Sequence, residues 1–188
     1  MDISTLLIIV IVLAVLVLLF LLRTYNRLVR LRNGVRNGWA DIDVQLTRRH
    51  DLVPNLVESV KGYMTHERQT LEAVTQARAA AMSASGAGIA MRATAELALG
   101  GAVGNLLGVA ERYPELKASQ SFLLLQEQLT STENRIAFAR QHYNETVRQL
   151  NTSVAEFPSN LIAGPFGFRP ESLFAADGGD RANVEVKI

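Results

Sequence analysis

The sequence predicts an all-α protein in which an N-terminal transmembrane helix continues into a long antiparallel bundle of three to four helices. Three observations lead to this fold class. Residues 3–22 form an uncharged, almost wholly apolar run, residues 28–46 repeat apolar side chains at helical spacing, and residues 122–157 repeat them every seven positions. A chain of 188 residues is long enough for one membrane anchor and one bundle.

The apolar run from Ile3 to Leu22 contains only two polar residues, Ser4 and Thr5. At about 1.5 Å per residue, the run covers roughly 30 Å, which is the thickness of the hydrocarbon core of a bilayer. A cleaved signal peptide would begin with basic residues and end at small ones, whereas this run ends directly before Arg23. Residues 1–22 are therefore predicted to be a retained transmembrane anchor.

Arginines crowd the segment that follows the anchor, and no acidic residue occurs between Ile3 and Ala40. Basic residues beside a span favour the cytoplasmic side and attract anionic lipid headgroups. We therefore expect a single-pass protein whose N-terminus lies outside and whose remaining chain lies in the cytoplasm. The residues expected to contact the membrane surface are Arg23, Arg27, Arg30, Arg32 and Arg36.

Several classes of function find no support in the sequence. The net charge of +1 is too small for a nucleic-acid-binding surface, and the absence of cysteine excludes disulfides and thiolate ligands. His50 and His66 lie sixteen residues apart and form no metal-binding pair, and no catalytic triad pattern or phosphate-binding loop occurs. No catalytic, metal-binding or cofactor-binding residue is predicted.

Residues 23–157 are predicted to form the bundle, and an apolar stripe carries the first helix out of the membrane without a break. Asp51 is a good N-cap and Pro54 suits a first turn, so we expect this helix to end after Arg49 or His50. A second helix is then expected from about Leu52 to Met82. The stripe of the first helix consists of Leu28, Leu31, Val35, Trp39, Ile42 and Leu46, and that of the second of Leu56, Val60, Tyr63, Leu71 and Val74.

Glycines mark two of the predicted helices. Gly34 and Gly38 lie one turn apart, either to let another helix approach closely or because glycine is merely tolerated there. A loop is expected over residues 83–88, followed by a third helix from Ile89 to Arg112. Its glycines at positions 100, 104 and 108 share one face, which we attribute to close packing within the bundle in preference to a second membrane span.

The dipeptide Tyr113-Pro114 ends the third helix and opens the last long one. Two charges, Glu133 and Arg140, interrupt its apolar seam, which has the heptad spacing of coiled-coil packing. They are either a catalytic pair or, as we favour, part of a structural charge network with Asp43, Arg48 and Arg49. The seam consists of Phe122, Leu129, Ile136, Tyr143, Leu150 and Phe157.

Residues 158–188 are rich in proline, glycine and phenylalanine, a composition that predicts an irregular segment without a helix. Phe166, Phe168 and Phe174 are expected to anchor it to the bundle or to a partner. Residues 177–180 are turn-like. Residues 184–188 alternate like a short strand, which is either disordered or added to the sheet of a partner.

Three long segments resemble the LemA family of bacterial membrane proteins: TYNRLVRLRNGVRNGWADIDVQLTRRHDLVPNLVESVKGY, VAERYPELKASQSFLLLQEQLTSTENRIAFARQHYNETVRQLN and FPSNLIAGPFGF. The resemblance implies a single span in the bacterial cytoplasmic (inner) membrane and a long antiparallel bundle. It implies no established catalytic activity. Members of the family look like accessories to other membrane proteins, including membrane zinc metalloproteases of the HtpX type, and a relative serves magnetosome membranes. The glycine-rich stretch from Leu99 to Gly108 departs from the family pattern.

These features predict a non-enzymatic, membrane-anchored scaffold or adaptor that self-associates and supports other membrane proteins. The apolar seam and the small-residue faces favour a homo-oligomer. The alternative is a protein that organises lipids or remodels the membrane through its basic juxtamembrane arginines.

Overall fold

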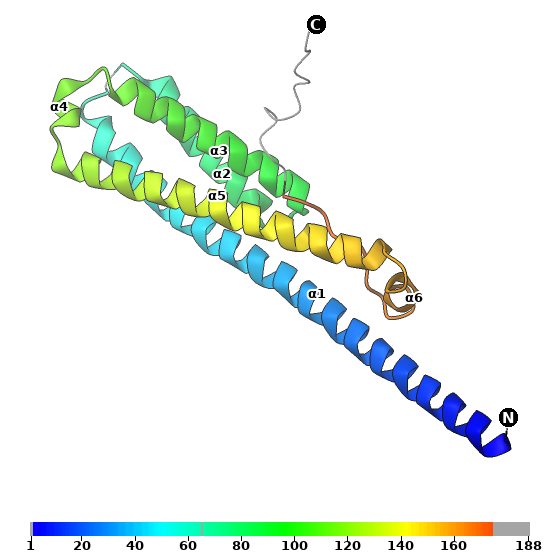
Figure 1. The fold of residues 1–188 in the computed structure, drawn as a ribbon. Helices are drawn as coiled ribbons and strands as arrows, with labels where there is room; N and C mark the ends of the chain where they lie inside the picture. Colours follow the sequence, from blue (N-terminus) through cyan, green and yellow to red (C-terminus); the bar gives the residue numbers. More distant parts are fainter. Residues whose placement is uncertain (1, 65, 175–188) are drawn as a thin grey trace, which may run out of the picture.

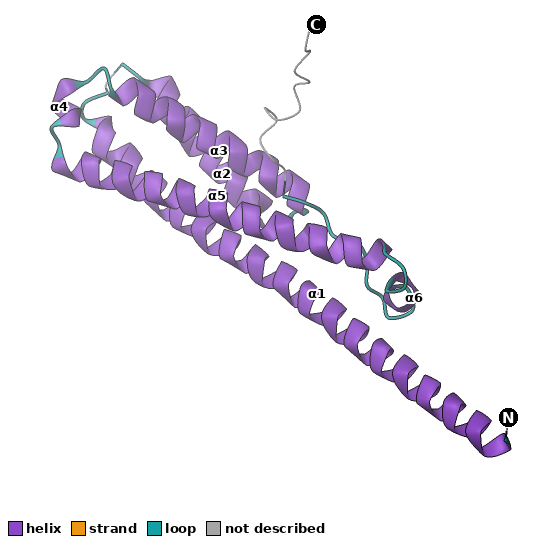
Figure 2. Cartoon of the chain, viewed as in Figure 1, coloured by secondary structure: helices purple, strands orange, loops and turns teal. Residues whose placement is uncertain are grey.

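The computed structural model describes residues 2–64 and 66–174, and within these the chain is helical and contains no strand. The turns and strand predicted over 177–180 and 184–188 lie outside the described residues. Figures 1 and 2 show the arrangement, and the all-α class is confirmed. The elements are α1 (Ile3–Lys61), α2 (Arg68–Ser83), the 3-10 turn η1 (Ala84–Gly86), α3 (Ile89–Ala110), α4 (Pro114–Lys117), α5 (Gln120–Ala155) and α6 (Asn160–Ala163).

α1 is a continuous 59-residue helix that joins the apolar run to the bundle, as the sequence predicts. α5 returns antiparallel along it, and α2 and α3 form a hairpin at the end far from the N-terminus (Figure 1). Within residues 2–64 and 66–174, two helices are long and apolar enough to cross a membrane. The apolar window of α1 has a mean hydropathy of 3.6 and none of it is buried, whereas that of α3 has 1.3 and is one-third buried.

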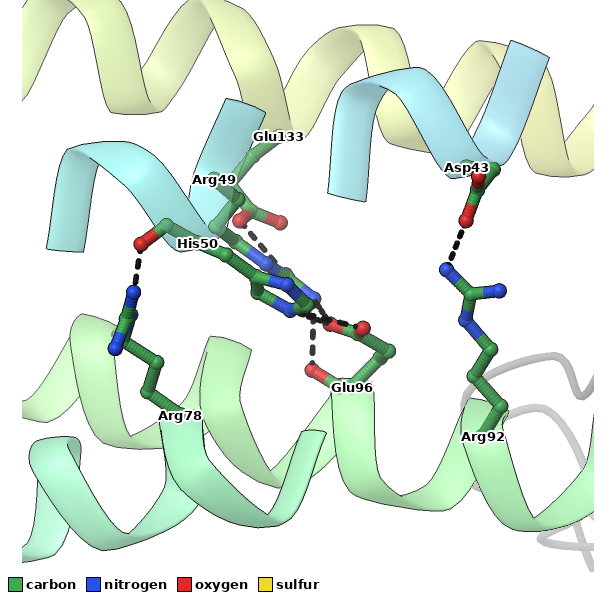
Figure 3. Close-up of polar contacts among 7 residues, drawn as sticks. All are labelled: Asp43, Arg49, His50, Arg78, Arg92, Glu96 and Glu133. Carbon is green, nitrogen blue, oxygen red and sulfur yellow. Dashed lines mark hydrogen bonds and ion pairs between the residues drawn. The ribbon is translucent and has the colours of Figure 1, made fainter. Parts of the chain in front are cut away.

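The predicted corner after Arg49 or His50 is wrong, because α1 continues through Pro54 to Lys61. Proline lacks the N–H that would bind the carbonyl four residues earlier, at His50. In the structure, Arg78 of α2 donates from Nε to that carbonyl oxygen over 2.8 Å (Figure 3). A long-range hydrogen bond thus replaces the missing helical one, so that α1 ends at Lys61 and α2 begins at Arg68.

Two apolar cores follow one another along the bundle. The proximal core, on the side of the N-terminal apolar run, lies mainly between α1 and α5 and contains Leu28, Val35, Ile42, Leu46, Ala93, Ile136, Tyr143, Val147, Leu150, Ile162, Ala163, Phe168 and Phe174. The distal core also involves α2, α3 and α4 and contains Leu52, Val53, Leu56, Val60, Met64, Val74, Ala81, Leu99, Val103, Leu106, Ala110, Leu116, Phe122 and Leu129. Tyr63, predicted for a helical stripe, is 42% exposed in the turn, where Met64 is buried instead.

The glycines of α1 allow a close approach to α5. A Cβ atom added to Gly38 would lie 3.3 Å from the Cα of Tyr143, and one added to Gly34 would lie 3.0 Å from Cγ2 of Thr146. The contact at Gly38 is to helix backbone, which turning a side chain cannot relieve, whereas the contact at Gly34 is to the side chain of Thr146. Of the two readings of this pair, close helix packing is the one that the structure shows.

The last helix and its seam differ in detail from the prediction. α4 forms a separate turn before α5, and the seam is buried from Phe122 to Leu150. Phe157 is 78% exposed because α5 ends at Ala155, two residues before it. The helix α6 was also not predicted, since the composition of residues 158–188 indicated irregular chain.

The C-terminal segment folds back on the bundle. Phe168 and Phe174 are buried, whereas Phe166 remains 61% exposed. The hydroxyl of Tyr143 donates to the carbonyl of Ser172 over 2.8 Å, and burial, with the nearby charge of Glu171, raises the pKa of Tyr143 to about 12. Asn144 forms two hydrogen bonds with the backbone of Phe174. The segment is therefore held to the bundle both by its buried phenylalanine side chains and by its backbone.

Candidate functional site

A buried ion-paired cluster lies between the two cores. Arg49 of α1 faces Glu96 of α3, and both side chains are only 3% exposed. Nη2 of Arg49 donates to Oε2 of Glu96 over 2.5 Å and to the backbone carbonyl of the same residue over 3.1 Å (Figure 3). The sequence places these charges here because Arg49 follows Ile42 and Leu46 on the inner stripe of α1, and Glu96 lies between the buried Ala93 and Leu99 of α3.

Two further side chains complete the cluster. Nε2 of His50 lies 3.0 Å from Oε1 and 3.3 Å from Oε2 of Glu96. Nη1 of Arg49 donates to Oε1 of Glu133 over 2.8 Å, and Glu133, on α5, is 43% exposed. The cluster therefore links α1 to α3 through a buried pair and α1 to α5 through a half-exposed one.

Burial and ion pairing act on Glu96 in opposite directions. Burial alone would raise the pKa of this carboxyl group, but the hydrogen bonds from His50 and Arg49 and their positive charge lower it further than burial raises it. The net pKa of Glu96 lies below its ordinary value. The carboxylate is therefore charged at neutral pH and is held by groups of the bundle itself.

The structure joins only some of the residues expected in a charge network. Arg49 and Glu133 pair directly, but Asp43 pairs with Arg92 of α3, whose guanidinium also lies 5.2 Å from the Trp39 ring centroid. Arg140 stacks 5.1 Å from the centroid of Phe174. Arg48 is exposed.

Sequence reasoning missed the α3 partners, Arg92 and Glu96, and the contribution of His50. A signal for them was available. Arg92 and Glu96 lie four residues apart, and so on one face, in a helix that is otherwise made of small and apolar residues. Charges on the buried face of such a helix require opposite charges on its neighbour, because an unpaired buried charge is costly.

A groove of about 540 Å³ opens above this cluster, between α3 and α5. Its floor includes Leu46 and Arg49 of α1. Gly100 and Gly104 lie on the α3 side, and Leu129 and Glu133 on the α5 side. A Cβ atom at Gly104 or Gly108 would meet nothing within 4 Å, and one at Gly100 would meet only Nη1 of Arg49 at 3.4 Å. Close packing therefore does not explain Gly104 and Gly108, contrary to the prediction.

Most of the arginines expected at a membrane surface are exposed. Arg23, Arg27, Arg30 and Arg36 project from α1 into solvent. Arg32 is half-buried, with its guanidinium 4.7 Å from the centroid of Phe168. Four of the five side chains are thus accessible to an anionic surface, whereas Arg32 packs against the C-terminal segment.

Chemically, the cluster is suited to holding helices together. Each carboxylate oxygen of Glu96 faces a side chain from α1, and Arg49 divides its donors between α3 and α5. Among residues 2–64 and 66–174, no group of three or more histidine or acidic side chains is arranged to hold a metal ion. The arrangement fixes the mutual position of three helices where the apolar cores are interrupted.

Comparison with known proteins shows the relationships of the chain. A family model described as the LemA family matches residues 38–188. Protein LemA of Metamycoplasma hominis is 25% identical over 165 residues, which cover 86% of this chain and 73% of that protein. Magnetosome protein MamQ 2 of Paramagnetospirillum magneticum is 24% identical, and MamQ of Magnetospirillum gryphiswaldense is 22% identical. In both magnetosome comparisons the match covers 82% of this chain and 65% of the relative.

Proposed function

This chain belongs to the LemA family, and on that premise we propose that it is a non-enzymatic, membrane-anchored helical scaffold or adaptor that self-associates and supports other membrane proteins. The observation that carries the proposal is the N-terminal part of α1. Its most apolar window has a mean hydropathy of 3.6, and no part of it is buried by the rest of the protein. A bare apolar helix of this length is stable in a bilayer and costly in water.

The charged residues of the bundle support a role without catalysis. Glu96, the most buried acidic side chain among the described residues, is held by Arg49 and His50, and Arg92 is held by Asp43. A catalytic acid or base needs a path to a substrate and a pKa near the working pH, whereas the pKa of Glu96 is lowered. These ion pairs are better suited to fixing the register of helices.

For location and partners, we propose a single pass through the bacterial cytoplasmic (inner) membrane, with the bundle in the cytoplasm. The exposed arginines after the apolar run favour that orientation. Two relatives are named as magnetosome proteins, which supports a role at membranes. We propose copies of the same chain as one class of partner and an integral membrane protein, such as a zinc metalloprotease of the HtpX type, as the other.

Affinity isolation of the full-length protein from its own membrane, after gentle extraction, tests this proposal. We expect several copies of the chain together with at least one membrane protein in a fixed ratio. Recovery of a single copy of the chain without a partner, or turnover of a substrate by the purified protein, would contradict the proposal.

The alternative, a lipid-organising protein, is favoured by the four exposed arginines beside the apolar run. Reversal of charge at Arg27 and Arg30 discriminates between the two functions. A scaffold held together by protein contacts keeps its assembly in the double variant, whereas a lipid-organising protein loses its effect on anionic vesicles. Arg135, which is exposed on α5 near the level of residue 46 of α1, provides a control reversal far from the apolar run.

The absence of cysteine makes the orientation directly measurable. A cysteine introduced at Ser131, an exposed position of α5, would be the only thiol in the chain. We expect a membrane-impermeant maleimide to label it only after the cells are opened. Labelling in intact cells from which the outer membrane has been removed would reverse the proposed topology.

A further inference from the structure

We propose that residues 157–166, at the C-terminal end of α5 and around α6, form a second contact with the membrane, in which exposed apolar side chains enter the headgroup region beside the transmembrane helix. The inference rests on the proposal that residues 3–22 span the bilayer. It adds a surface whose position and chemistry both fit a lipid interface. We call this segment the apolar foot.

The foot exposes large apolar side chains close together in the sequence. Phe157 is 78% exposed, Leu161 is 65% exposed and Phe166 is 61% exposed. Scattered exposed apolar residues are normal on a protein surface, whereas three large ones within ten residues concentrate apolar surface on one short segment. The position of this segment relative to the membrane should therefore explain why it exposes these side chains.

Ring contacts show where the foot lies along α1. The ring centroid of Phe166 is 5.1 Å from that of Tyr25, and the ring of Phe168 is 5.9 Å from it. Tyr25 lies three residues after Leu22, which is about 4.5 Å along the helix axis. Figure 1 shows α6 beside α1 at the end of the bundle that faces the N-terminal part of the chain.

This distance falls within the interfacial zone of a bilayer. The hydrocarbon core is about 30 Å thick, and the headgroup regions bring the total to roughly 40–45 Å, so each interface is about 5–8 Å deep. Apolar and aromatic side chains are favourable at this depth, and basic side chains nearby meet lipid phosphates. Arg23 and Arg27 on α1 and Arg169 after the foot are exposed and supply such charges.

One side of the foot packs into the bundle, so its exposed side chains must lie on the opposite side. Ile162, Ala163 and Phe168 are buried in the proximal core. The hydroxyl of Ser159 donates to the carbonyl of Ser153 over 2.6 Å, and the N–H of Phe168 donates to the carbonyl of Ala163 over 2.9 Å. The backbone that carries the exposed apolar side chains is therefore ordered before any lipid is bound, which lowers the entropic cost of binding.

Phe138 provides a matched control within the same chain. It is 72% exposed on α5, much as Phe157 is, but it lies far from the apolar run. Tyr143 faces Gly38 across the helix pair, so Phe138, five residues earlier on the antiparallel helix, lies near the level of residue 43. That level is about 30 Å beyond Leu22, outside the reach of the headgroups.

Tryptophan fluorescence in vesicles tests the proposal. The chain has one tryptophan, so Trp39→Phe provides a background into which Phe166→Trp, Phe157→Trp and Phe138→Trp are introduced one at a time. The full-length variants are reconstituted into vesicles of phosphatidylcholine and phosphatidylglycerol that carry bromine near the headgroup end of the acyl chains. We expect quenching at positions 166 and 157 at least threefold stronger than at position 138.

Each outcome bears on the proposal. Equal quenching at the three positions would overturn it, and so would blue-shifted but unquenched emission at position 166, which would indicate a protein contact in place of lipid. Position 157 keeps the test valid if the variant at 166 does not fold. Flotation separates the two levels of inference, since protein that floats with the vesicles without quenching refutes the foot alone, and protein that does not float refutes the membrane anchor and the foot together.

Discussion

The proximal and distal halves of the bundle solve the same packing problem differently. In the proximal half, Gly38 brings α1 against α5, and the C-terminal segment covers the pair through Phe168 and Phe174. In the distal half, α2 and α3 join the pair, yet α3 remains separated from α5 by a groove beside Gly100 and Gly104. Glycine thus closes one half and leaves the other open.

The two halves show that glycines spaced four residues apart on a helix do not by themselves indicate close helix packing. Gly34 and Gly38 face another helix directly, whereas Gly104 and Gly108 face open space. Between the halves, Arg49 and Glu96 replace apolar contacts with an ion pair. In the proximal half the helices pack closely, whereas in the distal half the groove between α3 and α5 is accessible.

The largest expected effect comes from breaking the cluster between the two halves. Glu96→Gln leaves the charge of Arg49 buried without its closest partner, and we expect a loss of about 3 kcal/mol in the free energy of unfolding. Denaturant unfolding of the full-length protein in mild detergent, followed by circular dichroism, measures it. Glu133→Gln removes the half-exposed partner of the same arginine and should cost at most about 1 kcal/mol. Equal losses in the two variants would refute a special role for the buried pair.

The stability difference between wild type and Glu96→Gln should also depend on pH. Because the folded pKa of Glu96 lies below the ordinary 4.5, its stabilising contribution is complete above that value and is lost as the pH falls through the lower folded pKa. The difference in stability between wild type and Glu96→Gln should therefore shrink below about pH 4.5. A difference that grows with acidification would have the wrong sign for this account.

The continuity of α1 into the distal half depends on Arg78. Arg78→Met leaves the carbonyl of His50 without its donor, and we expect a loss of about 2 kcal/mol in the free energy of unfolding. In a Pro54→Ala background, the new N–H at position 54 satisfies the same carbonyl, so Arg78→Met should cost less there. A double-mutant cycle measures this coupling, and strictly additive losses would show that Arg78 does not substitute for the proline.

The contrast between the glycines predicts opposite signs. Gly38→Ala places a Cβ atom 3.3 Å from the Cα of Tyr143, so we expect it to separate α1 from α5 and destabilise the protein by about 1.5 kcal/mol. Gly104→Ala meets nothing within 4 Å and should stabilise α3 by up to about 1 kcal/mol. Thermal melts measure the shift in Tm of each variant. Shifts of the same sign would contradict the difference in packing between the two halves.

The smallest effect concerns the cover of the proximal half. Tyr143→Phe removes the hydroxyl that donates to Ser172, and we expect a loss of about 1 kcal/mol. Limited proteolysis should cleave residues 169–174 faster in this variant than in wild type. Unchanged cleavage would mean that the ring and Asn144 hold this segment without the hydroxyl.

Much of the fold was predictable because long elements carry strong periodic signals. The apolar run, the extension of its helix into the bundle, the third helix and the seam from Phe122 to Leu150 all follow from spacing. The path through Pro54 did not, because the hydrogen bond that permits it comes from Arg78, whose distance from His50 no local pattern specifies. Tertiary contacts decided the position of that turn.

The ion pairs of the cluster were harder to predict from the sequence than the helices. Glu133 attracted attention because it interrupts a heptad seam, and it does contact Arg49. Glu96 lies in a glycine-rich helix without a heptad. Its spacing from Arg92 indicates that the two charges share one face of α3, but does not indicate which residues of α1 they meet. Pairing between helices depends on their relative rotation, which the composition of α3 leaves undetermined.

The central claim is that the chain acts as an assembled scaffold in the membrane, and the mass of the full-length particle, extracted gently from its native membrane, tests it most directly. The account predicts a homogeneous particle that contains several copies of the 20.6 kDa chain, with any partner in a fixed ratio. A particle with the mass of a single chain, free of partners under the mildest extraction that solubilises it, would contradict the account.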